Sequence, residues 1–387
     1  MKSNLKTMII MILGFCFALS TIICISIDKN AGNKDKSSEL IDNITFDNDN
    51  LQISKVSGKI HIDNNWTATK SAGICTGNGT YSEPYVIENL VIDGGGSGSC
   101  ILIENSEVHF KIGNCSLYNS GDYPNAGIQF SYVNNSQLIN NSCSSNTYGI
   151  YLSNSDNNTL SRNTVNNNLY GITLDSSYNN NISENTVNTN NYYGIRLRSR
   201  SNNNNVSGNT VDNNFRGIYV RFCDYNDITG NTAKNNYVGI YLDISDYNIV
   251  TGNTANNNDH GISLFICDSN NVSGNTASYN TYRGIILTTS DNNTVTGNTA
   301  NNNFYGIYLD TSNYNTISGN TLIGDVICIL EESCTENEFE DNGSCIVTKG
   351  EKRQLILGYE LFILIAMICI TSIIVLKKVK QIYEMRE

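Results

Sequence analysis

The chain has 387 residues and a formal net charge of −12 at pH 7. An acidic balance of this size argues against nucleic acid as a partner, because nucleic-acid binding needs a basic face. The length would allow two or three ordinary domains, but self-similarity along most of the chain indicates one elongated domain.

The first predicted element is an apolar segment at residues 8–27, which follows two lysines near the N-terminus. This pattern is typical of a signal peptide or of an uncleaved membrane anchor. A cap is expected before the first repeat, because an exposed terminal strand is an aggregation edge. We therefore assign residues 1–27 to a signal peptide or anchor, 28–52 to a flexible stalk and 53–84 to an N-terminal cap.

A Gly-Ile pair then returns every 22 or 23 residues through the middle of the chain. The alternation after each glycine, as in Ile150-Tyr151-Leu152, sends Ile and Leu inward and Tyr outward, as a half-buried strand requires. Two later apolar peaks in the same unit, Leu160 and Val165, predict two shorter strands with polar corners between them. The glycines of the repeat are Gly127, Gly149, Gly171, Gly194, Gly217, Gly239, Gly261, Gly284 and Gly306.

The composition of the units excludes helical repeats. Helical arrays need long stretches rich in Ala, Leu, Glu and Lys, whereas these units are crowded with Asn, Thr, Ser, Gly and Tyr. These residue types are instead typical of strands and turns. We predict an all-β fold, a single-stranded right-handed parallel β-helix (a solenoid) of about eleven coils, over residues 85–345.

Asparagine recurs at fixed places in each unit, and one of these columns is unbroken. Coils stacked ~4.8 Å apart would let equivalent Asn side chains pass amide hydrogen bonds to one another, as in cross-β ladders. We interpret this column as structural, because buried amides must be paired. It consists of Asn141, Asn163, Asn185, Asn209, Asn231, Asn253, Asn275, Asn298 and Asn320.

The chain after the repeat indicates a membrane anchor. Residues 346–354 are interpreted as a juxtamembrane linker, and the apolar run 355–376 is long enough to span a bilayer. Three lysines follow at once in the tail, residues 377–387. Because positive charge favours the cytoplasmic flank, we expect a cell-membrane protein with a cytoplasmic C-terminus and the β-helix outside.

Nine of the twelve cysteines lie outside the two apolar segments. In an oxidising compartment such residues pair where the coil geometry allows it. Cys115 and Cys143 occupy nearly matching positions in adjacent early coils, so they are well placed for a disulfide. A bridge among the three cysteines of the last coil, Cys328, Cys334 and Cys345, would lock the open end of the β-helix.

The coil unit at residues 305–321 reads Tyr-Gly-Ile-x-Leu-x-x-Ser-x-x-Asn-x-Ile-x-x-Asn-Thr. It resembles the right-handed parallel β-helix repeat of the NosD-like family and of a wider group of carbohydrate-binding proteins and sugar hydrolases. The segment at residues 79–94 is similar to the one that opens those domains. The resemblance covers about residues 75–345 and rests on scaffold Gly, Ile and Asn, so it implies a fold more than an activity.

The resemblance implies three kinds of function: saccharide binding, saccharide cleavage or epimerisation, and periplasmic copper handling as in NosD proteins proper. Copper would need clusters of Met, His or Cys. Every Met lies outside the coils, and the three histidines, His61, His109 and His260, share no column. Copper handling is therefore the least favoured of the three.

The outward positions of the long strand carry the densest cluster of Arg, Tyr and Asp in the chain. These residue types stack on sugar rings and hold carboxylates in bidentate pairs, so an acidic or hydroxyl-rich glycan would fit along them. The alternative is that outward Tyr and Arg are good cross-strand neighbours that Asp neutralises. The candidate glycan-binding residues are Asp175, Tyr193, Arg196, Arg198, Arg216, Tyr219, Arg221, Tyr241 and Asp243.

A second acidic column follows the long strand at the next corner. Neighbouring acids at this spacing repel one another, so they cap turns, bind Ca²⁺ or shift their pKa values. A turn formed within each coil is the default, and calcium is the weaker alternative. The candidate calcium residues are Asp224, Asp246, Asp268 and Asp291; no other metal site is predicted.

Enzyme chemistry finds less support in the sequence. Glycoside hydrolysis needs two carboxyl groups ~5 to 9.5 Å apart, whereas Asp175, Asp243 and Asp310 are each separated from the next by three coils, roughly 14 Å. The coils also lack the inserted loops that usually build active sites. We favour binding of a polysaccharide or cell-envelope component, including adhesion or structural display. The alternative is a polysaccharide-processing lyase, epimerase or hydrolase. No cofactor is expected, apart from Ca²⁺ at the second acidic column.

Overall fold

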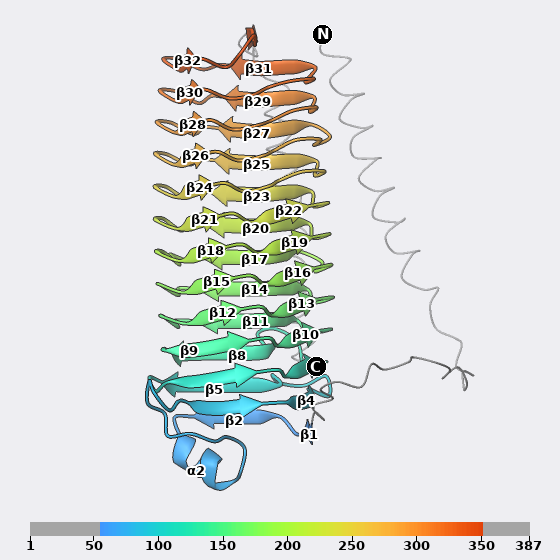
Figure 1. Cartoon of the computed structure of the whole chain (residues 1–387), viewed down its shortest axis with the longest axis vertical. Coiled ribbons are helices and arrows are strands. Elements are labelled where there is room, and N and C mark those ends of the chain that lie inside the picture. The colour runs from blue at the N-terminus through green and yellow to red at the C-terminus, as the bar shows by residue number, and fades with distance from the viewer. Residues whose placement is uncertain (1–54, 351–387) are drawn as a thin grey trace, which may run out of the picture. The chain divides into compact units, whose positions relative to one another are not determined.

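The computed structural model describes residues 55–350, which form an all-β parallel solenoid of about 12 turns (Figure 1). Three sheets run along it, and hydrogen-bonded neighbours within each sheet come from successive turns. The predicted number of coils, about eleven, is slightly low. Strands β1 and β2 lie inside the segment assigned to a cap, yet they pair with β4 and β5, so the sheets begin earlier than the repeat pattern indicates.

The long strands of each turn form a 13-stranded sheet. Its strands are β2 (Ile60–Asp63), β5 (Ile101–Ser106), β8 (Ala126–Val133), β11 (Tyr148–Ser153), β14 (Tyr170–Asp175), β17 (Tyr193–Arg198), β20 (Arg216–Arg221), β23 (Val238–Asp243), β25 (His260–Phe265), β27 (Arg283–Thr288), β29 (Tyr305–Asp310), β31 (Ile327–Glu332) and β33 (Val347–Gly350).

The shorter strands form the other two sheets. The 12-stranded sheet consists of β3 (Tyr85–Glu88), β6 (Phe110–Gly113), β9 (Ser136–Ile139), β12 (Thr159–Ser161), β15 (Asn181–Ser183), β18 (Asn205–Ser207), β21 (Asp227–Thr229), β24 (Ile249–Thr251), β26 (Asn271–Ser273), β28 (Thr294–Thr296), β30 (Thr316–Ser318) and β32 (Glu338–Glu340). The 8-stranded sheet consists of β1 (Lys55–Ser57), β4 (Leu90–Asp93), β7 (Ser116–Tyr118), β10 (Ser142–Ser144), β13 (Thr164–Asn166), β16 (Thr186–Asn188), β19 (Thr210–Asp212) and β22 (Thr232–Lys234). Isolated parallel bridges continue this last sheet from Thr232 to Thr321.

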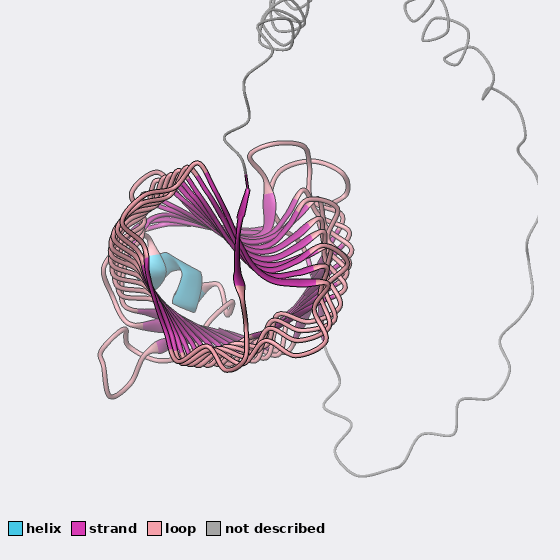
Figure 2. Cartoon of the chain, turned by 90° about the horizontal axis from the view of Figure 1, so that it is seen from above, coloured by secondary structure: helices cyan, strands magenta, loops and turns pink. Residues whose placement is uncertain are grey.

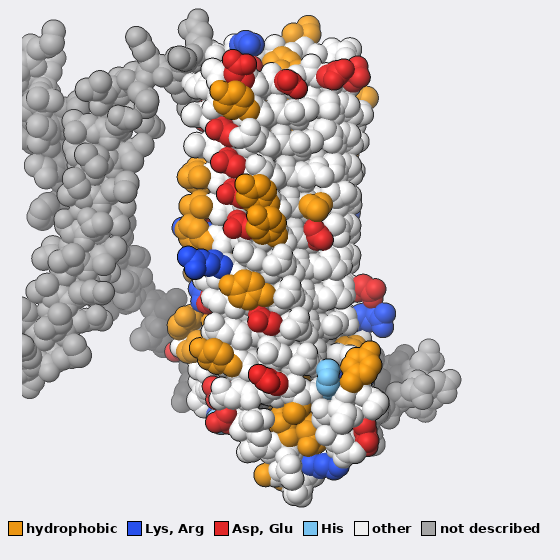
Figure 3. All heavy atoms as spheres, turned by 90° about the vertical axis from the view of Figure 1, so that its left-hand side faces the viewer, with side chains coloured by type: hydrophobic (Ala, Val, Ile, Leu, Met, Phe, Trp, Pro, Cys, Tyr) orange, Lys and Arg blue, Asp and Glu red, His pale blue; other side chains and the backbone are white. Residues whose placement is uncertain are grey.

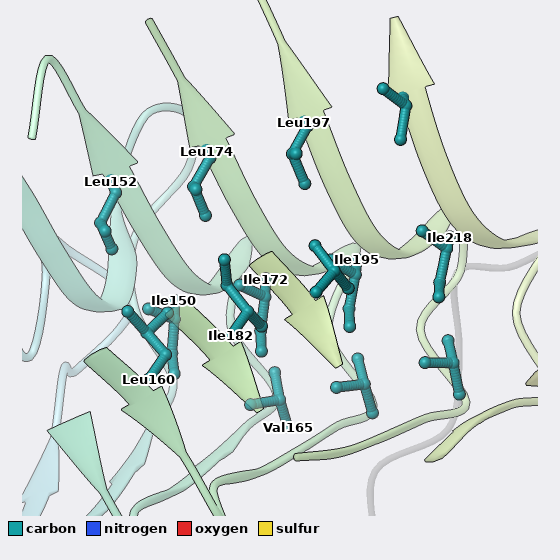
Figure 4. Close-up of a cluster of buried hydrophobic side chains, with 14 of the residues drawn as sticks. Ile150, Leu152, Leu160, Val165, Ile172, Leu174, Ile182, Ile195, Leu197 and Ile218 are labelled. Carbon is teal, nitrogen blue, oxygen red and sulfur yellow. The ribbon is translucent and has the colours of Figure 1, made fainter. Parts of the chain in front are cut away.

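The three sheets enclose a space along the axis (Figure 2), and the side chains of the hydrophobic core fill it. Ile150, Leu152, Leu160 and Val165 of one turn are all fully buried. They point toward one another, and their equivalents in the next turns stack on them (Figure 4). The inward and outward assignment of the predicted strands is therefore correct for this unit.

The repeat glycine is required by space rather than by a special backbone angle. A Cβ atom at Gly239 would lie 2.8 Å from both the carbonyl oxygen of Gly261 and the Nδ2 atom of Asn258. Real Cβ atoms do not approach neighbouring atoms so closely, so a larger residue would push the coils apart. Because glycine and the following Ile both face inward, the residue before glycine is free to lie on the outer surface.

Asparagine ladders join the turns at all three corners. The Nδ2 of Asn163 donates to the Oδ1 of Asn185 at 2.9 Å and to the carbonyl oxygen of Leu138 at 2.9 Å. Its Oδ1 in turn accepts the backbone N–H of Asn141 at 3.0 Å. The predicted structural column follows this pattern throughout and extends one step further, to Asn342.

Three coils have 23 residues between repeat glycines instead of 22, and each places its extra residue between ladder positions. The coil that begins at Gly171 is an example. Asn168 and Asn190 are hydrogen-bonded 22 residues apart, whereas the next strand pair matches Tyr170 with Tyr193. The additional residue therefore lies at the corner between Asn190 and Tyr193, where it disturbs neither the ladder nor the sheet.

Each end of the described solenoid is closed differently. At the N-terminal end, helix α2 (Trp66–Ser71) covers the core. The buried Trp66 ring stacks on Tyr85, with 4.9 Å between ring centroids, and its Nε1 donates to Ser106 Oγ at 2.8 Å. At the C-terminal end, Cys328 and Cys345 form a disulfide that joins β31 to the chain entering β33.

The disulfide confirms that a bridge closes the last coil. Cys334, the third cysteine of that coil, is free. The predicted pairing of Cys115 with Cys143 is wrong, because both are buried free thiols. The Sγ of Cys115 instead donates to the carbonyl oxygen of Gly113 at 3.3 Å.

The predicted membrane segments, residues 8–27 and 355–376, lie outside the described residues, as do the stalk and the tail. Within residues 55–350, no helix is long and apolar enough to cross a membrane.

The ladder predicts a large effect from one buried amide. Asn231→Ala removes a side chain that bonds Asn209, Val206 and Asn253, and it leaves buried backbone groups unpaired. We expect a loss of roughly 3 kcal/mol or more in the free energy of unfolding, measured by urea denaturation. The matched control Asn191→Ala changes an exposed asparagine and should cost less than about 0.5 kcal/mol. Equal losses in the two variants would contradict a structural role for the ladder.

A second prediction concerns the end of another ladder. Asp325 Oδ1 accepts the backbone N–H of Asn303 at 2.7 Å, but its Oδ2 is buried without a partner. Burial raises the pKa of Asp325 from 3.8 to about 6. The folded state therefore holds this proton more tightly than the unfolded chain, and the stability it contributes is lost as the pH rises from about 4 through about 6.

Asp325→Asn supplies an amide to the same position and should raise stability by about 1 kcal/mol at pH 7.5. The gain should shrink as the pH is lowered to 4, because the wild-type carboxyl is then protonated. Urea denaturation at both pH values checks this, and a gain independent of pH would contradict it.

Candidate functional site

The candidate site lies on the outer face of the 13-stranded sheet, where strand pairing aligns side chains in columns. Tyr148, directly before Gly149, stacks on Tyr151, with 4.8 Å between ring centroids. The residue before each repeat glycine therefore lies on the same outer face as the residue two positions after that glycine. We call the three outward positions the pre-glycine column, the second column and the third column. For the strands of the site they are occupied in turn by Tyr193, Arg196 and Arg198; Arg216, Tyr219 and Arg221; Val238, Tyr241 and Asp243; His260, Ser263 and Phe265; Arg283, Ile286 and Thr288; Tyr305, Tyr308 and Asp310.

The third column neutralises its own charges. Arg198 forms an ion pair with Asp175 in which Nε, at 2.8 Å, and Nη2 both donate to Oδ2. Arg221 pairs with Asp243 at 3.2 Å, and the hydroxyl of Tyr219 donates to the same carboxylate at 2.7 Å. These contacts hold four of the six charged residues of the predicted patch as two compensated pairs, as expected if they are cross-strand neighbours that neutralise one another.

Arg216, in the pre-glycine column, has a different environment. Its guanidinium carbon lies 4.6 Å from the ring centroid of Tyr219, 4.7 Å from that of Tyr241 and 5.8 Å from that of Tyr193. Among the described residues it has no ion-pair partner, and its Nε is buried without a hydrogen bond. The aromatic rings therefore hold a cation that no carboxylate neutralises.

The same arrangement recurs three turns later, around a residue that the sequence analysis missed. The guanidinium carbon of Arg283 lies 4.5 Å from the ring centroid of Tyr308 and 5.6 Å from that of Tyr305. Its Nε is also buried and unpaired. Arg283 and Arg216 both stand directly before a repeat glycine, and this shared position is the signal that would have found it.

A hollow of about 330 Å³ lies between the two arginines. In the second column, Ser263 lies between Tyr241 of the preceding turn and Ile286 of the following turn. The hollow exists because the small serine side chain stands where an aromatic ring would otherwise cover the face. Polar and aromatic side chains from both sides line it, including Arg216, Tyr241, His260, Ser263, Arg283 and Tyr308. Of the nine predicted glycan-binding residues, Arg216 and Tyr241 line the hollow. The other seven lie outside its lining, three of them on the same two strands, β20 and β23, and four on β14 and β17.

His260 is the second lining residue that the sequence analysis did not place in a site. Its ring lies between Tyr237 and Tyr282, with centroids 5.7 Å and 5.6 Å away. Burial, reinforced by the positive charge of Arg283, lowers the pKa of His260 to about 4. The imidazole is therefore neutral at pH 7, and its buried Nδ1 has no hydrogen-bond partner.

The second acidic column lies at the corner after the long strands. The Oδ1 of Asp224 accepts the backbone N–H of Asp246 at 2.8 Å, and the same contact repeats up the column to Asp268, Asp291 and Asn313. These carboxylates thus bond the next coil, instead of forming the turn within one coil that the sequence favoured. Exposed hydrophobic residues, among them Phe222, Ile244 and Ile266, follow the same corner, and Figure 3 shows acidic side chains in line beside hydrophobic ones on this side.

Metal ligands do not converge within the described residues. Across residues 55–350, no group of three or more His, Cys, Asp or Glu side chains could hold a metal ion. His61 pairs with Glu104 at 2.8 Å, and His109 packs against Tyr81. Calcium at the second acidic column stays a prediction that these contacts do not test.

A family model described as "Periplasmic copper-binding protein (NosD)" matches residues 76–219, 108–276 and 198–348, which together exceed half of the chain. The donor set that copper prefers is not assembled among the described residues, so we derive no step through copper. No curated protein sequence matches the chain.

Solved structures similar to this one share its fold. The A-module of the Azotobacter vinelandii mannuronan C-5 epimerase AlgE6 is 16% identical with a TM-score of 0.51, over 69% of this chain and 88% of that one. The AlgE4 A-module from the same organism is 14% identical with a TM-score of 0.53, over 68% and 83% of the two chains. The Dettilon tailspike protein is 17% identical with a TM-score of 0.56, over 68% of this chain and 62% of its own.

The environment of His260 predicts a pH-dependent stability. The folded-state pKa of about 4 lies below the ordinary value of 6.5, so the unfolded chain binds the proton more readily. The stabilising contribution is complete above pH 6.5 and is lost as the pH falls toward 4. His260→Gln should therefore reduce the drop in urea midpoint between pH 7 and pH 5. His61 and His109 are present in both proteins, so they cancel in the comparison. An identical drop in the variant would contradict the assignment.

Proposed function

This chain belongs to the NosD family, and from that premise we propose that its solenoid binds carbohydrate on the outer face of the 13-stranded sheet. The observation that carries the proposal is the hollow between Arg216 and Arg283, walled by Tyr241 and Tyr308. A concave site with aromatic walls and a few convergent polar groups is the usual form of a small-ligand site.

The shape of the face suits a chain-like ligand. The columns repeat at ~4.8 Å along the solenoid axis, so an extended saccharide lying along the axis would meet an equivalent set of positions at each turn. Tyrosine supplies an apolar ring and a hydroxyl together, which matches the mixed surface of a sugar. The AlgE6 and AlgE4 modules, which are named for an epimerase of the polysaccharide mannuronan, have the same fold and add support.

We further propose that the solenoid stands outside the cell membrane as an adhesion or display module for a cell-envelope component. The support is the predicted membrane segment at residues 355–376 with lysines after it. The disulfide between Cys328 and Cys345 adds to this, because such bonds persist in oxidising compartments.

The second candidate is a polysaccharide-processing enzyme, and one observation favours it. The hollow brings together a neutral imidazole, two guanidinium groups and tyrosine hydroxyls, and such groups can stabilise or transfer charge on a bound sugar. The lining of the hollow holds a single carboxylate, Asp310. A hydrolase with paired carboxyl groups is therefore disfavoured relative to a lyase or an epimerase.

Tyr241→Ala tests carbohydrate binding. The full-length protein, purified in detergent, is applied to a glycan array with and without Ca²⁺, and the affinity for the best glycan is then measured. We expect Tyr241→Ala to weaken it about tenfold or more, since it removes one aromatic wall of the hollow. Tyr247→Asn is the matched control, because Tyr247 is an exposed tyrosine at the corner, with φ of 57°, where other coils carry Asn.

The outcome separates the two candidates. Binding that is absent from the wild type, or that is equally weakened by the control, would overturn carbohydrate recognition at the hollow. Release of unsaturated or epimerised product from the bound glycan would establish the enzyme instead. Binding that requires Ca²⁺ would bring the second acidic column into the site.

A further inference from the structure

The inference concerns the charge of the ligand, and it rests on the proposed carbohydrate binding. We propose that the hollow selects acidic sugars, and that Arg216 and Arg283 hold the carboxylate or sulfate groups of one oligosaccharide. The shared chemistry is an oxyanion on a sugar unit, which a planar guanidinium binds through two parallel N–H donors.

The contrast among the arginines of this face carries the argument. Arg198 and Arg221 each have an aspartate partner from an adjacent turn. Arg196, Arg216 and Arg283 have none among the described residues. Of these three, Arg216 and Arg283 line the hollow, whereas Arg196 lies on β17 outside its lining. Two guanidinium groups without an aspartate or glutamate partner therefore line the hollow.

The unpaired polar atoms beside the hollow are a second, independent observation. Arg216 Nε, His260 Nδ1 and Arg283 Nε are buried atoms without hydrogen-bond partners, and all three belong to the pre-glycine column beside the hollow. Buried polar groups are normally paired, and an unpaired one costs roughly 1 to 3 kcal/mol. The cation and ring contacts around each guanidinium offset part of that cost, and a bound oxyanion on the outer N–H groups would offset more.

Among the residues that line the hollow, the balance of charge is positive. The two guanidinium groups face one carboxylate, Asp310, which accepts a hydrogen bond from the hydroxyl of Thr311 at 3.0 Å. The imidazole of His260 adds no charge at pH 7. A neutral sugar would leave this excess of positive charge uncompensated, whereas an acidic sugar would compensate it.

The spacing of the two arginines indicates the length of the ligand. Three turns separate Arg216 from Arg283, a span of roughly 14 Å along the axis. A monosaccharide reaches one guanidinium at a time. An oligosaccharide with repeated acidic units reaches both, and its second contact then forms at a high effective concentration.

Isothermal titration of the full-length protein tests the proposal with four probes: a galacturonate oligosaccharide, its methyl ester, a sulfated oligosaccharide and a neutral oligosaccharide of similar length. We expect the acidic forms to bind at least about tenfold more tightly than the ester and the neutral form. The galacturonate and sulfated arms tell which oxyanion is preferred. The comparison of acid with ester uses the wild type alone, so it stands even where a variant fails to fold.

Arg216→Gln and Arg283→Gln should each weaken binding of the acidic probe about tenfold, which is a larger factor than the loss for the neutral probe. Arg162→Gln is the matched control, because Arg162 is an exposed arginine paired with Glu184 away from this sheet. Equal affinity for acid and ester, or no effect of either substitution, would overturn the selection of acidic sugars while leaving carbohydrate binding intact. Failure of all four probes to bind would overturn the selection and would count against the binding function itself.

Discussion

The structure depends on one constraint: each turn must lie over the last at the spacing of neighbouring strands, with like side chains in register. The amide of Asn231 shows why, because it bonds backbone or side-chain atoms of turns on both sides. An amide out of register by one residue would leave buried donors and acceptors unpaired. The hydrophobic core is thin, so these directed contacts decide which stacking is allowed.

The strict register of the core residues also aligns the residues of the outer face in columns. Once Ile and Leu of the long strand are stacked in the core, the outward residues of successive turns are forced into neighbouring positions. Asp175 and Arg198 then meet as an ion pair, and Tyr219 meets Tyr241 as stacked rings with centroids 5.3 Å apart. Where a small residue such as Ser263 replaces the large side chain of a column, the outer face has a hollow. Specific chemistry therefore arises where the scaffold varies within its own repeat.

Most of the fold could be predicted from the repeat period, because period, inward alternation and Asn spacing all describe contacts between equivalent positions. The unbroken Asn column is an example. The pairing of Cys115 with Cys143 was wrong because the two residues are not in register: Cys143 pairs with Leu117, and Cys115 lies before β7 begins. The early start of the sheets was missed because β1 and β2 precede any recognisable repeat.

The site was only partly predictable for a related reason. Arg216 and Tyr241 could be found as members of a dense cluster, and they do line the hollow. The hollow itself depends on the small size of Ser263. A search of the sequence for functional residue types does not detect a position where an aromatic side chain is absent. Arg283 and His260 were missed because each stands apart from the cluster along the chain, although the stacking brings both beside it.

The corner that absorbs the extra residue between Asn190 and Tyr193 has a consequence for how such a protein changes over evolutionary time. Small insertions survive at corners, where they leave ladder and sheet intact. Duplication or loss of a whole coil also preserves every contact, since each turn meets only its two neighbours. The length of the outer face and the location of the hollow along it can therefore change independently. Related chains can differ in the number of coils while keeping the same residues around the hollow.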